Sequence, residues 1–161
     1  MEIIKITTMD FSSKDYFLNL ADQFFGHIGS TNVHDTLSNV NFDISLKATL
    51  DDEVVGFYLL SDKSNLIEEI KKESASIFFK EDEYLGKKSL EGCAMGVIEA
   101  YRSRGIGQML IDSSISLAKK NGYDFIFGQH HKDLNNIKYW LARRKLIAES
   151  KNVYFTLKDV I

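Results

Sequence analysis

One stretch constrains the fold of this chain more than any other, because an apolar run leads directly into a turn rich in arginine and glycine. The apolar run Met95–Ile98 predicts the end of a strand, and the turn after it predicts the head of an amphipathic helix. A helix start exposes unpaired backbone N–H groups and the positive end of the helix dipole, and glycines leave these groups open to an anion. Two arginines can add guanidinium contacts. The residues of this predicted phosphate-binding turn are Arg102, Ser103, Arg104, Gly105, Ile106, Gly107 and Gln108.

Apolar periodicity on both sides of the turn predicts a mixed sheet with helices packed on it. Short alternating or β-branched runs predict strands, and apolar residues at helical spacing predict helices. The expected strands are Ile3–Thr7, Ile44–Leu50, Val54–Leu60, Leu90–Ile98, Tyr123–Gly128 and Val153–Leu157. The expected helices are Ser12–His27, a short one at Val33–Leu37, one from Ile106 to a C-cap at Asn121-Gly122, and Ile137–Arg144 after Asn135 or Asn136. This order places the chain in the α/β class, of the α+β type.

The connection between Ser61 and Ser89 carries apolar residues of its own and is therefore expected to be ordered. Leu66, Ile67 and Ile70 favour a short helix within it. The remaining apolar residues, Ile77-Phe78-Phe79 and Tyr84-Leu85, fit either a helix or a lid.

Length and composition limit the classes of protein to which the chain can belong. Its 161 residues, 44% of them hydrophobic, predict one globular domain over residues 1–161. A net charge of −3 provides no basic field for nucleic acid. No apolar run reaches the length of a membrane span, and the first residues lack a signal-peptide core. Neither nucleic acid nor a membrane is an expected partner, and a cytoplasmic location is expected.

Three other kinds of site fit the sequence less well. A P-loop needs a Lys-Ser or Lys-Thr after its glycines, and none follows here. A dinucleotide fingerprint needs the spacing Gly-x-Gly-x-x-Gly after a βαβ half, but the third glycine is missing and a β-hairpin precedes the turn. Cys93 is the single cysteine, so no intrachain disulfide forms and a reducing compartment is suitable. With no activating His or Asp beside it, Cys93 is expected to be a buried strand residue rather than a nucleophile.

The turn and its surroundings resemble the GNAT superfamily of N-acetyltransferases over nearly the whole chain. Arg102-x-x-Gly105-x-Gly107 matches the family signature Q/R-x-x-G-x-G/A, and Tyr101 and Gln108 suit its flanks. A hairpin with Val55-Gly56-Phe57, the strand ending in Gly96-Val97 and the late helix with Tyr139-Trp140 follow the family's order. Two departures lie near that helix: Arg144-Lys145-Leu146 replaces the usual Gly-Phe, and the asparagines have shorter spacing. The resemblance implies a GNAT fold with a mostly antiparallel sheet of about six to seven strands.

The resemblance also implies the donor substrate and how it is held. Acetyl-CoA, or another acyl-CoA, would place its pyrophosphate on residues 102–108, with no metal required. Its pantetheine arm would pair like an extra strand with the backbone of Met95, Gly96 and Val97, between two splayed strands. Asn135, before the late helix, completes the expected cofactor-binding residues.

Transfer to an amine requires a base, because a lysine-like amine with a pKa of about 10.4 costs on the order of 4 to 5 kcal/mol to deprotonate at neutral pH. Glu91 matches the strand position where the histone-modifying branch of the family has a glutamate. The alternative is an ordinary solvated glutamate, and Glu99 is the weaker candidate. His130 and His131 could act as a base or bind a metal, but both roles are less favoured.

A tyrosine of the late helix protonates the leaving thiolate in many family members, which makes Tyr139 the candidate acid. Either it or Trp140 is expected to face the cofactor while the other packs in the core. The run Arg143-Arg144-Lys145 is expected to be a solvated helix end, with contact to the CoA 3′-phosphate as the alternative.

Together these features predict an N-acetyltransferase that transfers an acetyl group from acetyl-CoA to a primary amine by direct attack in a ternary complex. A backbone N–H near Val97 would stabilise the oxyanion. The acceptor is a small molecule or a protein; the acidic residues between Ser61 and Ser89 fit either a cationic acceptor or a solvated surface. The alternatives are a non-catalytic acyl-CoA sensor or scaffold, and a fold in which the glycines only form the bend. A homodimer is compatible with the sequence.

Overall fold

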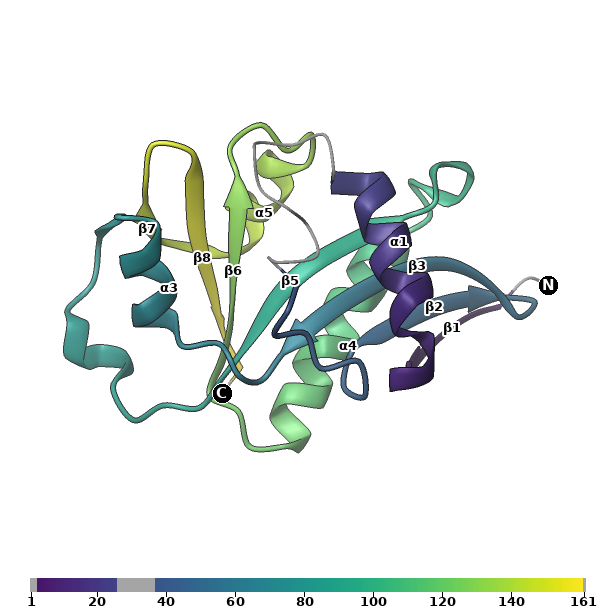
Figure 1. The fold of residues 1–161 in the computed structure, drawn as a ribbon, viewed down its shortest axis with the longest axis horizontal. Coiled ribbons are helices and arrows are strands. Elements are labelled where there is room, and N and C mark those ends of the chain that lie inside the picture. Colours follow the sequence, from purple (N-terminus) through teal and green to yellow (C-terminus); the bar gives the residue numbers. More distant parts are fainter. Residues whose placement is uncertain (1–2, 26–36, 161) are drawn as a thin grey trace.

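The computed structural model describes residues 3–25 and 37–160, which form one eight-stranded sheet with helices on both faces (Figure 1). The strands are β1 Ile4–Thr8, β2 Leu46–Leu50, β3 Glu53–Ser61, β4 Ser76–Ile77, β5 Ser89–Val97, β6 Phe125–His131, β7 Lys145–Glu149 and β8 Val153–Asp159. The helices are α1 Lys14–Phe25, α3 Leu66–Lys72, α4 Ile106–Lys120 and α5 Ile137–Arg143, with short 3-10 turns η1 Phe11–Ser13, η2 Glu81–Tyr84 and η3 Glu99–Tyr101. Within this part of the chain, no helix is long and apolar enough to cross a membrane.

The strands follow the order β1-β2-β3-β5-β6-β8-β7-β4. Only β5 and β6 pair in parallel among the described strands, so the expected mixed and mostly antiparallel sheet is confirmed. The sheet exceeds six to seven strands because β7 pairs with β8 and the two-residue β4 adds to β7 at the edge. Neither β4 nor β7 was expected, since β4 is too short for a periodic pattern and β7 follows α5 almost directly.

Side-chain alternation along β6 separates the two faces of the sheet. Phe125 and Phe127 pack with Leu66 and Ile70 of α3, whereas the intervening Ile126 packs with residues of α4. On the other half of the sheet, α1 packs on the same face as α3, and α5 lies on the α4 face. The sheet therefore has an α1/α3 face and an α4/α5 face.

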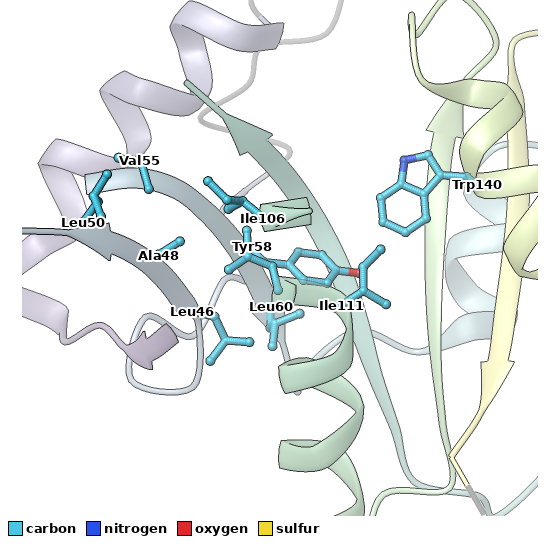
Figure 2. Packing of buried hydrophobic residues seen from close by; sticks show 10 residues of the cluster. Leu46, Ala48, Leu50, Val55, Tyr58, Leu60, Ile106, Ile111 and Trp140 are labelled. Atoms are coloured by element: carbon cyan, nitrogen blue, oxygen red, sulfur yellow. The ribbon is translucent and has the colours of Figure 1, made fainter. Parts of the chain in front are cut away.

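The largest cluster on the α4/α5 face joins the β2–β3 hairpin to α4 and α5 (Figure 2). Its buried members come from β2, β3, α4 and α5 and include Tyr58, Ile106, Leu110 and Trp140. Tyr58 and Trp140 have ring centroids 6.4 Å apart, so a β3 side chain contacts the late helix directly. This cluster fixes α5 and the start of α4 relative to the centre of the sheet.

Most expected elements occur near their expected bounds, and the differences have local causes. The strand expected at Tyr123–Gly128 begins at Phe125, because the Tyr123 N–H donates to the Ala118 carbonyl and completes the end of α4. Ile77-Phe78-Phe79 forms neither a helix nor a lid: the first of these residues belongs to β4, and the Phe78 N–H donates to the Ile147 carbonyl of β7. The predicted helix at Val33–Leu37 and the end of the first helix lie outside the described residues, except for Leu37.

Candidate active site

The two parallel strands of the sheet separate halfway along their length. Pairing between β5 and β6 ends at Gly92 and Gly128, beyond which the strands diverge (Figure 1). β5 also carries a bulge here, because Leu59 opposes Ala94 while Leu60 opposes Gly92 and leaves Cys93 as the additional residue. The result is a gap with its apex at the two glycines.

The backbone of β5 beyond the apex faces this gap. The Ile98 N–H donates to the Val55 carbonyl of β3, so by alternation the backbone groups of Met95 and Val97 point away from β3. Met95 and Val97 are two of the three residues expected to pair with pantetheine, whereas the backbone groups of the third, Gly96, face Phe57 of β3. The gap therefore exposes backbone groups of β5 with which an extended ligand could form hydrogen bonds, as a neighbouring strand does.

The turn after β5 adopts the tight conformation expected of it. Ser103 and Gly105 both have left-handed backbones, with φ of 65° and 81°, and Gly105 is the N-cap residue of α4. The Arg102 Nε donates to the Val97 carbonyl at 2.9 Å, and its guanidinium lies 5.7 Å from the Phe24 ring centroid. Arg102 thus also ties the turn to the end of β5.

A pocket lies in front of the α4 N-terminus. It is lined by Phe24, Phe25, Met95, Gly96, Val97, Tyr101, Arg102, Ser103, Gly105, Ile106, Gly107, Gln108, Leu134, Asn135, Asn136, Tyr139 and Arg143. All the expected cofactor-binding residues are among them except Arg104, whose guanidinium lies 5.2 Å from the Tyr101 ring. We call this hollow the turn pocket.

A second pocket occupies the gap nearer its apex. It is lined by Phe25, Leu37, Tyr58, Glu73, Gly92, Cys93, Ala94, Met95, Gln129, His130, His131, Leu134, Asn136, Trp140 and Val153. We call it the apex pocket. Because Phe25, Met95, Leu134 and Asn136 line both pockets, the two form one path from the helix N-terminus to the apex.

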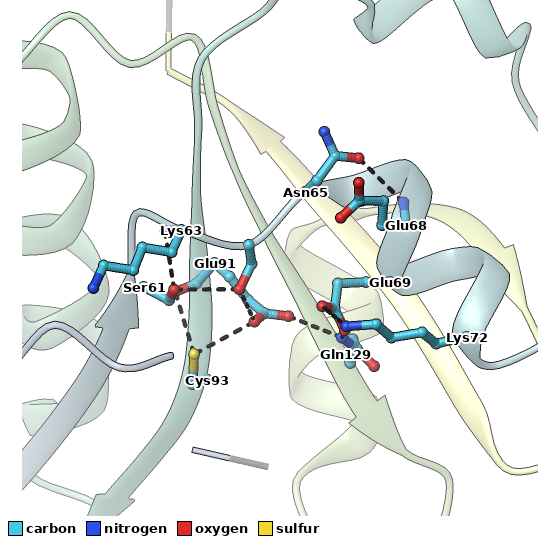
Figure 3. Close-up of polar contacts among 10 residues, drawn as sticks. Ser61, Lys63, Asn65, Glu68, Glu69, Lys72, Glu91, Cys93 and Gln129 are labelled. Atoms are coloured by element: carbon cyan, nitrogen blue, oxygen red, sulfur yellow. Dashed lines mark hydrogen bonds and ion pairs between the residues drawn. The ribbon is translucent and has the colours of Figure 1, made fainter. Parts of the chain in front are cut away.

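Glu91 does not line the apex pocket itself but is hydrogen-bonded to Gln129 and Cys93, which do, on the α1/α3 face (Figure 3). Its carboxylate accepts hydrogen bonds from the Ser64 hydroxyl and the Gln129 amide, each at 2.9 Å, and from the Cys93 thiol at 3.5 Å. Burial raises the pKa of Glu91 above its ordinary value. Neither pocket is lined by Glu91 among the described residues, but Gln129 and Cys93 connect it to the apex pocket.

Tyr139 lines the turn pocket, whereas Trp140 is buried in the core and also lines the apex pocket. The Tyr139 hydroxyl donates to Gln108 Oε1 at 2.7 Å, which places it in the turn pocket beside the start of α4. Burial raises the pKa of Tyr139. Trp140 is buried and stacks on the His130 ring with centroids 4.8 Å apart.

Of the other candidates, His130 and Cys93 lack the properties of reactive groups. His130 is buried, its Nε2 lies 2.7 Å from the Thr156 hydroxyl, and burial lowers its pKa to about 3, so it is a poor base. Burial raises the pKa of the Cys93 thiol well above its ordinary value, in agreement with a thiol that is not a nucleophile. His131 Nδ1 lies 3.6 Å from Asp133, and the described residues contain no cluster able to hold a metal ion.

A comparison with known protein families identifies the family to which this chain belongs. Residues 15–142 match the model of the acetyltransferase (GNAT) family. The chain belongs to this family. It is therefore an acyltransferase, as the signature in the turn indicated. No curated protein matches this acetyltransferase significantly in sequence.

Solved structures similar to this acetyltransferase share its fold at low sequence identity. Ard1 from Thermoplasma volcanium is 17% identical with a TM-score of 0.65, and 98% of each chain is covered. The PaiA N-acetyltransferase from Thermoplasma acidophilum, in complex with coenzyme A, is 14% identical with a TM-score of 0.66 and coverage of 98% and 99%. The polyamine N-acetyltransferase of Drosophila melanogaster, which forms N-acetylagmatine, is 11% identical with a TM-score of 0.66 and coverage of 98% and 100%. These likenesses confirm the GNAT fold.

Three residues of the apex region of this acetyltransferase were not found from the sequence. Tyr58 lies in a strand where any aromatic residue suits the core, and Gln129 precedes the two histidines that drew attention. Arg144 was expected to be solvated with its neighbours, but it is buried and donates to the Tyr58 hydroxyl. The only local signal was its position in place of the family's Gly-Phe.

Proposed function

We propose that this acetyltransferase transfers an acetyl group from acetyl-CoA to a primary amine by direct attack in a ternary complex. The observation that carries the proposal is the single path from the N-terminus of α4 to the apex between β5 and β6. One end of the path suits a pyrophosphate, and the other is lined by both polar and aromatic side chains. Such a path can hold a long donor whose reactive group meets an acceptor at the apex.

The donor lies along the path with its pyrophosphate at the turn. The first N–H groups of α4 have no partner within the helix, and Gly105 and Gly107 leave them uncovered. The pantetheine arm then pairs with the backbone of Met95 and Val97, as an added strand does. The coenzyme A bound to the PaiA N-acetyltransferase supports acetyl-CoA as the donor.

Glu91 is the proposed base, and it acts on the amine through water. A base is most effective when its pKa approaches the working pH, and burial moves the pKa of Glu91 in that direction. Because Gln129 and Cys93 separate the carboxylate from the apex pocket, an ordered water beside them would carry the proton from the amine.

The acetyl carbonyl lies near the gap-facing backbone of β5. The N–H groups of Met95 and Val97 point into the gap and are the proposed donors to the oxyanion that forms during attack. Tyr139 remains the family-based candidate for the acid. Its hydroxyl, however, is held by Gln108 at the pyrophosphate end of the path.

The proposed acceptor is a cationic amine of a small molecule or a protein. Glu73, at the end of α3, lines the apex pocket, and Glu69 of the same helix accepts from Gln129 at 2.9 Å. These carboxylates lie on the α1/α3 face, from which an acceptor would meet the donor. The fold similarity to a polyamine N-acetyltransferase supports trying such amines first.

A substrate panel tests the proposal. Purified protein is incubated with acetyl-CoA and polyamines, lysine-containing peptides, peptides with free N-termini or aminoglycosides, while free thiol and acetylated amine are both measured. Amine-dependent thiol release with an equal amount of acetylated product supports the function. CoA binding without thiol release across the panel contradicts it and favours a sensor or scaffold.

A further inference from the structure

The core of the α4/α5 face contains an arginine without a counter-ion. Arg144 follows α5 and is only 7% exposed. Its Nη2 donates to the Tyr58 hydroxyl at 3.1 Å, and its guanidinium lies 4.7 Å from the centre of the Trp140 ring. Nη1 is buried with no hydrogen-bond partner, and no carboxylate pairs with Arg144 in the part of the chain that the structure describes. An unpaired buried cation is costly, so its position calls for a function.

Arg144 and Tyr58 meet at the apex of the gap. A methyl group on Gly92 would overlap the Tyr58 hydroxyl, and one on Gly128 would lie 3.6 Å from Arg144 Nη1. These two glycines form the last rung between β5 and β6. The cation is therefore located immediately behind the point where the strands separate.

The hydrogen-bond direction leaves Tyr58 with a free proton. A guanidinium only donates, so the Tyr58 oxygen accepts from Arg144 and its O–H can donate elsewhere. The described residues provide no acceptor for this O–H. Tyr58 lines the apex pocket, and its hydroxyl points toward Trp140 across the gap (Figure 2). The pocket thus has a hydrogen-bond donor with a positive charge directly behind it.

The two polar clusters at the apex lie on opposite faces of the sheet. The Glu91 network lies on the α1/α3 face, where Gln129 and the carboxylates of α3 gather. Tyr58 and Arg144 lie on the α4/α5 face, which also carries the start of α4. The face that carries the α4 N-terminus, where we place the pyrophosphate, is therefore also the face that carries the Tyr58 hydroxyl and Arg144.

We propose that the Tyr58 hydroxyl donates a hydrogen bond to the sulfur of the bound thioester and stabilises the leaving thiolate, with the buried Arg144 as its positioning residue. This inference rests on the proposed function. The amine nitrogen forms the C–N bond, the C–S bond breaks, and its electron pair moves to sulfur. The ammonium loses one proton to the Glu91 side before the nitrogen attacks, the nitrogen loses a second proton to water as the amide forms, and the thiolate acquires one from water on release. Tyr58 keeps its proton throughout.

Arg144 strengthens Tyr58 as a donor in two ways. Its hydrogen bond to the phenol oxygen fixes the direction of the O–H and polarises it. Its charge also attracts the negative charge that develops on sulfur, in surroundings with little water. Two other titratable groups interact with them, Tyr139 and His130; burial raises the pKa of Tyr139 and lowers that of His130 to about 3, so both stay neutral and add no competing charge.

The test compares phenol-to-phenyl variants in the whole protein. Tyr58→Phe removes only the hydroxyl and leaves the buried Arg144 without its hydrogen-bond acceptor. If this single variant is unstable, the double variant Tyr58→Phe/Arg144→Met removes the buried charge as well and keeps the core apolar and folded. Tyr123→Phe is the matched control, because Tyr123 contacts Lys88 far from the path. With the best amine of the panel, we expect kcat to fall about 100-fold in both Tyr58 variants and to stay unchanged in the control. The dissociation constant of acetyl-CoA should change less than threefold.

A second measurement needs no acceptor. The ultraviolet absorbance of the thiolate reports the pKa of the CoA thiol when CoA is bound, against about 8.5 for a free thiol. We expect bound CoA to titrate at least one pH unit lower in the wild type and to return toward the free value in the double variant. A merely structural role of Tyr58 and Arg144 would not move this titration.

The outcomes separate the inference from the function on which it rests. If the wild type acetylates amines but Tyr58→Phe keeps its kcat, or if Tyr139→Phe alone abolishes kcat, the role of Tyr58 is wrong while the function stands. An unshifted CoA thiol in the wild type also overturns it. If no amine is acetylated, the proposed function fails, and the thiol titration still decides whether Tyr58 and Arg144 stabilise a thiolate.

Discussion

Gly107→Glu should stabilise the free protein and weaken CoA binding at the same time. A Cβ at Gly107 would have Met95 Cε as its nearest neighbour at 3.5 Å, which is ordinary contact. A helix glycine replaced by glutamate gains about 0.5 to 1 kcal/mol, and the first turn of α4 has no acidic residue to complement the dipole. The melting temperature without ligand should therefore rise by about 2 to 4 °C.

The effect on the ligand has the opposite sign. Two unit charges about 4 Å apart repel by about 4 kcal/mol at an effective dielectric constant of 20, and screening at an open site reduces this. We expect at least a tenfold higher dissociation constant for CoA, or about 1.4 kcal/mol. At a CoA concentration of 100 times the dissociation constant of the wild type, CoA should then stabilise the variant by about 1.4 kcal/mol, compared with about 2.7 kcal/mol for the wild type.

Thermal melts with and without CoA measure both effects, and titration calorimetry gives the dissociation constant. Ser116→Glu places the same charge on the exposed side of α4 away from the turn and should leave the CoA-induced shift unchanged. If Gly107→Glu retains the full CoA-induced shift, the pyrophosphate does not lie at this helix start and the reasoning is refuted.

Three further variants test the rest of the site. Glu91→Gln should lower kcat by about 10² to 10⁴ without loss of acetyl-CoA binding, and unchanged kcat would show that another group is the base. Because burial raises the pKa of Glu91, the folded protein binds the proton of this carboxyl more tightly than the unfolded chain does. The Glu91 carboxyl therefore makes the free energy of unfolding decrease as the pH rises above the ordinary pKa of a glutamate. Chemical denaturation at several pH values should show that this decrease is absent in Glu91→Gln. Burial lowers the pKa of His130 to about 3, so the folded protein binds this proton less readily than the unfolded chain. The free energy of unfolding should therefore fall by up to about 1.4 kcal/mol per pH unit as the pH drops from 6.5 toward 3, and His130→Gln should reduce this fall. Gly92→Ala should destabilise by about 1 to 3 kcal/mol in urea because its methyl overlaps Tyr58, whereas an unaffected midpoint would place that hydroxyl elsewhere.

The turn and the helix start that line the turn pocket were predictable because their signals are local. A turn that needs left-handed backbone and a helix start free of side chains shows itself through Gly105 and Gly107 in the sequence. The strand before it is apolar, and the helix after it is amphipathic over its length. Both elements formed near their expected bounds, and the family signature falls on the same residues.

The apex was not predictable in the same way, because its chemistry depends on contacts between distant parts of the chain. Arg144 has the sequence context of a solvated helix end, yet β7 begins immediately after it and directs the guanidinium toward Tyr58, 86 positions earlier. Glu91 was a candidate from the sequence, but its hydrogen-bond partners Ser64 and Gln129, which come from a loop and another strand, were not. Burial, and therefore the pKa of each group, follows from this packing rather than from neighbours in sequence.

The most direct test of the account is a time course of free thiol and acetylated amine with wild-type protein, acetyl-CoA and the amine panel. The account predicts that one thiol is released for each amine acetylated, with an amine-dependent rate well above that of acetyl-CoA hydrolysis. Saturable acetyl-CoA binding with no amine-dependent release of thiol would contradict it.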